Sequence, residues 1–363
     1  MQQHRKHGGN LKEASELYHI DEDELLDFSA NINPLGPPAA IYEVITNNLA
    51  KIKHYPDSRN KDLKNRLAAH LSLSDNNIVM GNGASELIFL LINYLRPSQV
   101  WIPSPTFAEY EIAARSCHAQ ITRLPLGGEK MNIFNLDKLQ GMAENDLIFI
   151  CNPNNPTGQL YPAFFLEEVY NIIKNSKAYF VIDESFLDFL EDKKSISFMG
   201  RINEYSRLIV LYSLTKFFTI PGLRLGALIT NPSLAGEFEG IRDPWNINIF
   251  AQLAGVTALQ DEDFMKTTLD FYKEEKKFLF SRLAAMEGIR PLPPSANFIF
   301  IKLQPPHTAS KICELLAHEN ILVRNCNSYP YLGEEYLRVA IKARAENLRL
   351  LAKLEEKLSN NGT

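Results

Sequence analysis

Residues 213–226 have the sequence SLTKFFTIPGLRLG and follow the apolar run LIVLY at 208–212. Lys216 lies between hydroxyl residues and eight positions before Arg224. A buried lysine amine can lose its proton and form a Schiff base with an aldehyde. Ser213 and Arg224 supply the donor and the cation that a phosphate monoester needs. Pyridoxal 5'-phosphate (PLP) has both groups, so the stretch predicts a PLP site. The alternative is a loop lysine at the edge of the core.

Two earlier segments offer polar groups for the ring of such a cofactor. Residues 178–183, AYFVID, are an apolar run ending in Asp183, and ligands of open α/β sheets gather at the carboxyl ends of strands. A carboxylate there can keep a pyridine nitrogen protonated, which makes the ring an electron sink. Asn155, in NPNNPTG at 152–158, suits a hydrogen bond to the ring hydroxyl. The alternatives are an aspartate that caps a turn and a simple turn after a strand.

The first phosphate contact is expected from the glycine turn Gly81-Asn-Gly-Ala84-Ser85, which precedes the apolar stretch 87–95. A glycine turn that opens a helix presents free backbone N–H groups to an anion. Phe107, which follows a proline turn, could stack on the ring. Most turns and aromatic residues of this kind bind nothing, so both assignments depend on the other motifs.

These segments together resemble the PLP-dependent class that contains the aspartate aminotransferases, along nearly the whole chain. The resemblance is strongest for the branch of histidinol-phosphate aminotransferase and threonine-phosphate decarboxylase. It implies a Schiff base on Lys216, Asp183 at the pyridine nitrogen, Asn155 at the ring oxygen and Phe107 on the ring. It also implies a cofactor phosphate bound by Ala84, Ser85, Ser213, Arg224 and, from the neighbouring subunit of a homodimer, Tyr55. Phe186 stands where many relatives have a tyrosine.

The two ends of the chain indicate a phosphorylated amino-acid substrate. Arg324, in ILVRN, and Arg338, in YLRVAI, interrupt apolar runs, where a guanidinium is costly without an anionic partner. Two such cations suit a substrate with a carboxylate and a phosphate. The resemblance assigns Arg338 to the carboxylate, and it assigns the phosphate to Arg324 with His7, Gly8 and Asn31. The alternative for each arginine is a structural ion pair with a nearby glutamate.

The resemblance implies PLP-dependent decarboxylation of O-phospho-L-threonine to (R)-1-amino-2-propanol phosphate, for cobalamin biosynthesis, with Lys216, Asp183 and Asn155 as catalytic residues. A histidinol-phosphate aminotransferase is the nearest alternative, because both reactions use the same electron sink and differ in which bond stands out of the ring plane. Two alternative hypotheses concern proteins that are not enzymes: a non-catalytic PLP-binding regulator and an α/β binding protein without a cofactor. No basic helix-turn-helix segment precedes residue 41, which argues against the regulator.

The order of the apolar runs predicts an α/β fold. Runs at 100–103, 147–151, 179–183, 208–212 and 226–230 alternate with amphipathic stretches, which is typical of a mostly parallel sheet covered on both faces. By resemblance this is the type I PLP-dependent fold, with a seven-stranded sheet and a smaller C-terminal α/β domain. We expect an N-terminal arm at 1–40 that contributes to the site, a large PLP-binding domain at 41–255 and a small domain at 256–363. A tail helix should bury a stripe at 348, 351, 354 and 358.

Composition excludes several classes of protein. The chain has 363 residues and a net charge of −5, with no basic patch for nucleic acid and no polybasic membrane contact. No apolar run follows the N-terminal MQQHRKH, so we expect no secretory signal, and the nine-residue stretch 87–95 is too short to span a bilayer. The four cysteines lack CxxC spacing, which favours free thiols of a cytoplasmic protein and no metal site.

Overall fold

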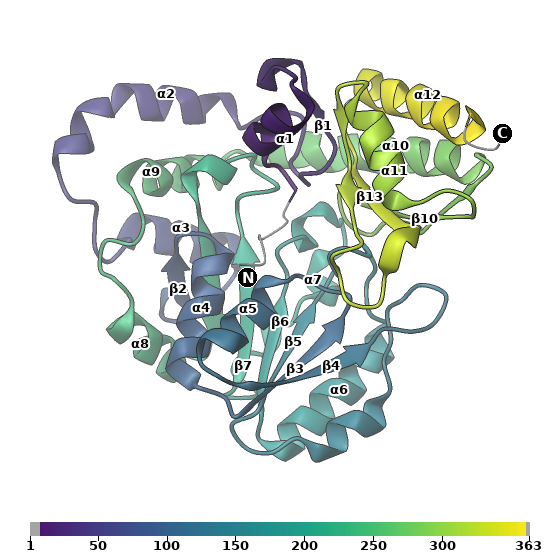
Figure 1. The fold of residues 1–363 in the computed structure, drawn as a ribbon. Helices are drawn as coiled ribbons and strands as arrows, with labels where there is room; N and C mark the ends of the chain where they lie inside the picture. Colours follow the sequence, from purple (N-terminus) through teal and green to yellow (C-terminus); the bar gives the residue numbers. More distant parts are fainter. Residues whose placement is uncertain (1–7, 361–363) are drawn as a thin grey trace.

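A computed structural model describes residues 8–360 and contains a seven-stranded sheet with the order β2-β8-β7-β6-β5-β3-β4 (Figure 1). Strand β8 is antiparallel to both of its neighbours, and the other strands run parallel to one another. The predicted mostly parallel sheet of a type I PLP-dependent fold is therefore confirmed. The strands are β2 (Ile78–Gly81), β3 (Gln99–Ser104), β4 (Gln120–Pro125), β5 (Leu147–Cys151), β6 (Tyr179–Asp183), β7 (Leu208–Ser213) and β8 (Gly226–Thr230).

Each central strand is apolar throughout because the sheet is buried on both faces. In β7, Leu208 and Val210 belong to one apolar cluster, whereas Ile209 and Leu211 belong to another on the opposite face. Figure 1 shows helices on both sides of the sheet. The helices between residues 39 and 258 are α2 (Ala39–Asn47), α3 (Lys61–Leu71), α4 (Ala84–Leu95), α5 (Glu109–Ser116), α6 (Ala163–Ser176), α7 (Lys193–Ile196), α8 (Pro232–Ile241) and α9 (Ile249–Ala258).

A second, four-stranded antiparallel sheet has the order β12-β13-β10-β9. Its strands are β9 (Ile289–Pro291), β10 (Phe298–Leu303), β12 (Arg324–Asn325) and β13 (Tyr336–Ala340). The sheet packs with α10 (Glu262–Ala284), α11 (Ala309–Ala317) and α12 (Arg344–Asn360), and Figure 1 shows this layer beside one end of the large sheet.

The stripe predicted for α12 was partly wrong. Leu351, Leu354 and Leu358 are buried, but Leu348 is 44% exposed and Leu350 is fully buried. With a rotation of about 100° per residue, the side chains of Leu351, Leu354 and Leu358 share one narrow arc of the helix. Leu348 lies about 60° beyond one edge of that arc, and Leu350 lies about 40° beyond the other edge, so the buried face is shifted toward Leu350.

The N-terminal arm joins the two layers. After α1 (Leu11–Tyr18), strand β1 (Leu26–Asp27) pairs in parallel with β11 (Ile321–Leu322), so the run 321–325 forms two short strands with different partners. Buried Asn33 donates to the carbonyl of Phe217 at 2.9 Å and to the hydroxyl of Thr268 at 3.1 Å. The arm thus connects the lysine loop with α10. The domain boundaries at residues 40 and 255 stay predictions.

The apolar character of the helices and the state of the cysteines bear on where in the cell the protein is found. Among residues 8–360, no helix has both the length and the apolar character that a bilayer crossing needs. All four cysteines are free thiols. The cytoplasmic location stays a prediction.

The buried side chain of Asn347 links helix α12 to helix α10, and its removal tests how much this link stabilises the fold. Its buried amide donates to Glu275 at 2.9 Å and to the carbonyl of Lys342 at 2.6 Å. Asn347→Ala should lower the free energy of unfolding by about 2–3 kcal/mol, because a buried carboxylate loses a donor. Chemical denaturation measures this, with Lys311→Ala, which removes an exposed pair, as a control expected to cost less than about 0.5 kcal/mol. Equal effects of the two substitutions would contradict the prediction.

Candidate active site

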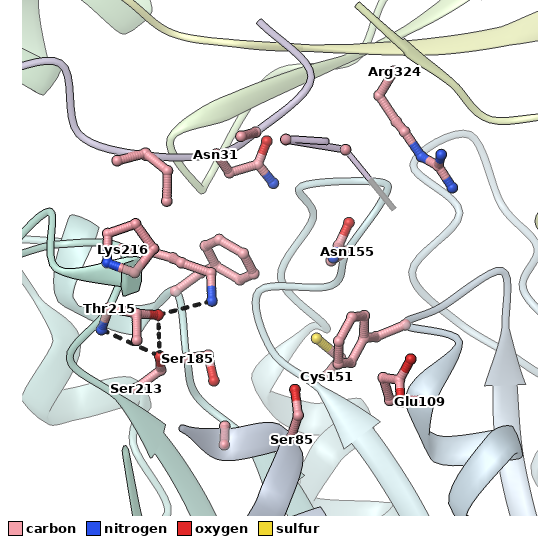
Figure 2. A pocket seen from close by; sticks show the side chains of 18 of the residues that line it. Asn31, Ser85, Glu109, Cys151, Asn155, Ser185, Ser213, Thr215, Lys216 and Arg324 are labelled. Atoms are coloured by element: carbon pink, nitrogen blue, oxygen red, sulfur yellow. Dashed lines mark hydrogen bonds between the residues drawn. The ribbon is translucent and has the colours of Figure 1, made fainter. Parts of the chain in front are cut away.

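A cavity of about 610 Å³ lies where the carboxyl ends of β5, β6 and β7 meet the start of α4. It brings together twelve of the fourteen predicted site residues, drawn from the arm and from both layers. They are Gly8, Asn31, Ala84, Ser85, Phe107, Asn155, Asp183, Ser213, Lys216, Arg224, Arg324 and Arg338. Tyr55 does not line the cavity, and His7 lies outside the described residues. Figure 2 shows Lys216, Asn155 and Arg324 on different walls of the same space.

The Lys216 amine lies just beyond the end of β7. It donates to the Thr215 hydroxyl at 3.0 Å, and that hydroxyl lies 2.8 Å from the hydroxyl of Ser213 (Figure 2). Burial lowers the pKa of Lys216 to about 8, and the charge of Arg224 acts in the same direction, while Asp183 opposes them. A substantial fraction of the amine is therefore neutral, and able to attack a carbonyl carbon, near pH 8.

Asp183 ends β6 with both carboxylate oxygens engaged. Tyr110, on α5, donates its hydroxyl at 2.6 Å, and the backbone N–H of Ser185 donates at 2.9 Å. Burial and the neighbouring Asp183 raise the pKa of Tyr110 well above its ordinary value, so the phenol stays protonated as a donor. Tyr110 is itself fixed by stacking on Phe149 at 4.5 Å. These contacts hold the carboxylate in place at the wall of the cavity.

The turn before α4 and Arg224 form a cradle for an anion. Gly83 has φ +83°, and a Cβ there would meet Nη2 of Arg224 at 2.4 Å. A Cβ on Gly226 would lie 2.7 Å from the backbone nitrogen of Ala84. Because neither glycine has a Cβ, the first residues of α4 can lie close to strand β8 and to the guanidinium of Arg224. Free N–H groups at a helix start, hydroxyls and a guanidinium are the donors that phosphate monoesters bind.

Arg338 is buried in the wall of the cavity that also contains Lys216. It donates to Oδ1 of Asn155 and, at 2.7 Å, to the carbonyl of Ser29 in the arm, and its guanidinium lies 5.1 Å from the ring centre of Phe298. Within residues 8–360, no carboxylate forms an ion pair with it, and its Nε has no hydrogen-bond partner. The alternative of a structural ion pair is therefore excluded for this arginine in the described part of the chain.

Arg324 and Arg338 are direct cross-strand neighbours. They face each other in the register of β12 and β13, and both are buried in the cavity wall. Burial lowers the pKa of Arg338, and the charge of Arg324 contributes to that lowering. Two buried guanidinium groups side by side repel each other, so a ligand with anionic groups would relieve the cost of burying them.

Several residues of the site were missed from the sequence. Thr215 contacts the lysine, Tyr110 contacts Asp183, and Ser29 contacts Arg338 through its backbone. Thr215 adjoins Lys216 and could have been found by its position, whereas Tyr110 and Ser29 have no local signal. Phe186 lines the cavity, with its ring centre 5.9 Å from the lysine amine.

Comparison with known proteins gives the family of this arrangement. The class I and II aminotransferase family matches residues 23–354. The chain belongs to this family. It is 35% identical, over 97% of its length and 96% of the relative's, to threonine-phosphate decarboxylase from Salmonella typhimurium. The resemblance inferred from the motifs is therefore confirmed.

Two solved structures show the same fold at comparable length. Histidinol-phosphate aminotransferase from Clostridium acetobutylicum superposes with a TM-score of 0.86 and 34% identity, over 93% of this chain and 100% of the other. L-threonine-O-3-phosphate decarboxylase from Porphyromonas gingivalis superposes with a TM-score of 0.81 and 25% identity, over 92% of this chain and 99% of the other.

PLP is the cofactor of this family of enzymes, and the cavity suits it. The donors around the α4 start can hold its phosphate, Lys216 can bond to its aldehyde carbon, and Asp183 can pair with its ring nitrogen. Because Oδ1 of Asn155 already accepts from Arg338, the amide nitrogen is the group left to donate to the ring oxygen. The prediction of a PLP-dependent enzyme is thus confirmed.

The pKa of Lys216 predicts how the apoprotein takes up its cofactor. Only the neutral amine attacks the aldehyde, so the uptake rate should rise about tenfold per pH unit below pH 8 and level off above it. Stopped-flow absorbance after adding PLP to cofactor-stripped protein measures this. Asp183→Asn removes a charge that raises the pKa, so it should move the midpoint to lower pH. A midpoint near 10.5 would contradict the environment described for the amine.

Proposed function

We propose that this enzyme decarboxylates O-phospho-L-threonine to (R)-1-amino-2-propanol phosphate. The observation behind this proposal is the cross-strand pair of buried cations, Arg324 and Arg338, in the wall of the cavity that Lys216 also lines. Phosphothreonine has a carboxylate and a phosphate on one small molecule, so it provides an anion for each guanidinium at once.

In this proposal each residue has a separate task. Arg338 binds and orients the substrate carboxylate, fixed by its own contacts with Asn155 and Ser29. Arg324, with Asn31, Gly8 and His7, binds the substrate phosphate. PLP, when bound, supplies an electron sink for the bond to the α-carbon that stands perpendicular to its ring. Lys216 accepts and returns protons at its Nζ, and its lowered pKa suits that work near neutral pH.

The relatives support the same substrate class. The protein at 35% identity is named a threonine-phosphate decarboxylase. A bifunctional protein of adenosylcobalamin biosynthesis from Leptospira interrogans is 30% identical over 95% of this chain, which corresponds to 40% of that longer protein. We therefore place the reaction in the assembly of cobalamin. The proposed product has a phosphate and a primary amine, and the amine is available for a later condensation.

A histidinol-phosphate aminotransferase is the second candidate, favoured by the 34% identity to the Clostridium acetobutylicum structure. Histidinol phosphate has a phosphate but no carboxylate, so it would leave Arg338 without an anion in the amino-donor complex. The same arginine could instead serve a keto acid in the other half of the reaction.

Product analysis separates the two reactions. Holoenzyme incubated with phosphothreonine and no keto acid should release carbon dioxide over many turnovers, because decarboxylation regenerates the cofactor. A transaminase would stop after one equivalent per site and leave the aminated cofactor, which absorbance detects. Carbon dioxide that does not exceed one equivalent, together with turnover of histidinol phosphate and a keto acid, would overturn the proposed function.

We also propose that the enzyme is a homodimer in which Tyr55 completes the neighbouring site. Tyr55 is 78% exposed and does not line the cavity of its own chain. Its ring lies tilted against the ring of Trp245, with the two ring centres 4.7 Å apart. Residues 35–55 expose several other large apolar side chains, a composition typical of interfaces. They are Leu35, Tyr42, Leu49 and Ile52, and Trp245, which contacts Tyr55, is also exposed.

Mixed dimers test the shared site. When Lys216→Ala and Tyr55→Ala chains are mixed, one site of each mixed dimer would have both defects and the other would have neither. Activity of the mixture should therefore exceed the sum of the two separate preparations, reaching about a quarter of the wild-type value with equal random mixing. Activity that stays additive would show that Tyr55 serves its own chain.

A further inference from the structure

Tyr329 lies in the cavity wall beside Arg324, in a turn that follows β12. The guanidinium carbon of Arg324 is 5.4 Å from the centre of the Tyr329 ring, within the range of a cation–π contact. Nη2 of Arg324 also donates to the hydroxyl of Ser328 at 3.1 Å. The turn 326–329 closes with the backbone N–H of Tyr329 donating to the carbonyl of Cys326 at 3.1 Å. The guanidinium is therefore held by two consecutive residues of one turn.

The Tyr329 ring is anchored, whereas its hydroxyl is available. The side chain is 9% exposed and belongs to an apolar cluster with Leu292, Phe300, Cys326 and Leu332. Its hydroxyl forms no hydrogen bond with any residue from 8 to 360, although the side chain lines the cavity. A tyrosine hydroxyl in a largely buried position usually finds a partner. Here the cavity is where a ligand can supply that partner.

The second arginine of this wall lies next to Arg324. Arg338 is the direct cross-strand partner of Arg324, and Arg324, Arg338 and Tyr329 all line the same cavity. Tyr329 thus shares the cavity wall with both cations. A ligand oxygen between Arg324 and the Tyr329 hydroxyl would receive a donor from each of them.

We propose that Tyr329 is a specificity-determining residue that selects phosphorylated substrates. Its ring positions Arg324, and its hydroxyl donates to the phosphate oxygen that Arg324 binds. This inference deepens the proposed function, since it names a further contact for the phosphate of the same substrate. A phosphate monoester fits because it is a tetrahedral acceptor with three free oxygens, which can accept from a guanidinium and a phenol together.

The test uses holoenzyme and matched ligands with and without the phosphate: O-phospho-L-threonine with L-threonine, and histidinol phosphate with histidinol. Titration followed by the change in cofactor absorbance gives an affinity that does not depend on which bond is later broken. Tyr329→Phe should weaken each phosphorylated ligand about tenfold, as expected for one hydrogen bond to a charged group, and leave the other ligands unchanged. The KM for phosphothreonine should rise while kcat stays within about twofold.

Two further variants separate contact from packing. Tyr336→Phe makes the same atomic change on a neighbouring ring that stacks on Phe300 outside the cavity, and it should alter no affinity. Tyr329→Leu removes ring and hydroxyl and should approach the loss caused by Arg324→Ala. Thermal unfolding of each variant reports on folding.

The outcomes distinguish this inference from the proposed function. If the wild-type protein does not prefer phosphorylated ligands, the proposed substrate class fails. If it does prefer them, but Tyr329→Phe binds them as the wild type does or weakens both kinds of ligand equally, the role of Tyr329 is refuted while the proposed function stands.

Discussion

The concentration of positive charge in one cavity with largely buried walls is the constraint on which the site depends. Lys216, Arg224, Arg324 and Arg338 all line it, and Asp183 is fixed on its wall by Tyr110 and Ser185. Cations held together away from water are costly unless anions accompany them. A cofactor phosphate and the doubly anionic substrate that we propose would provide such anions. In this proposal, binding of the ligands also neutralises the charge of the cavity.

The mostly parallel large sheet and the antiparallel second sheet each bring part of these side chains to the cavity. In the large sheet, parallel strands end at one edge, so β5, β6 and β7 deliver Asn155, Asp183 and Lys216 to neighbouring places. In the second sheet, antiparallel pairing sets Arg324 opposite Arg338 by register. The residues that we assign to the cofactor therefore come mostly from the first sheet, and the two arginines that we propose for the substrate come from the second.

The sequence predicted the elements with strong local signals and missed those that depend on tertiary contacts. The run LIVLY and the lysine after it were found because a buried parallel strand is apolar throughout. Strand β4 was missed because this edge strand is partly exposed and mixes polar with apolar residues. Tyr110 was missed because nothing in its neighbourhood signals that its hydroxyl meets a carboxylate 73 positions away. Helix α12 was predicted, but its buried face was assigned incorrectly, because the prediction included the exposed Leu348 and left out the buried Leu350.

The pairing of β1 with β11 has a consequence for the order in which the enzyme is completed during translation. Leu26 lies beside Ile321, and the carbonyl of Ser29 receives its bond from Arg338, so these early residues have no final partners until almost the entire polypeptide has left the ribosome. The large sheet, whose strands end at residue 230, can form before that point. A nascent chain would therefore possess the lysine and its phosphate cradle well before it possesses a closed substrate chamber.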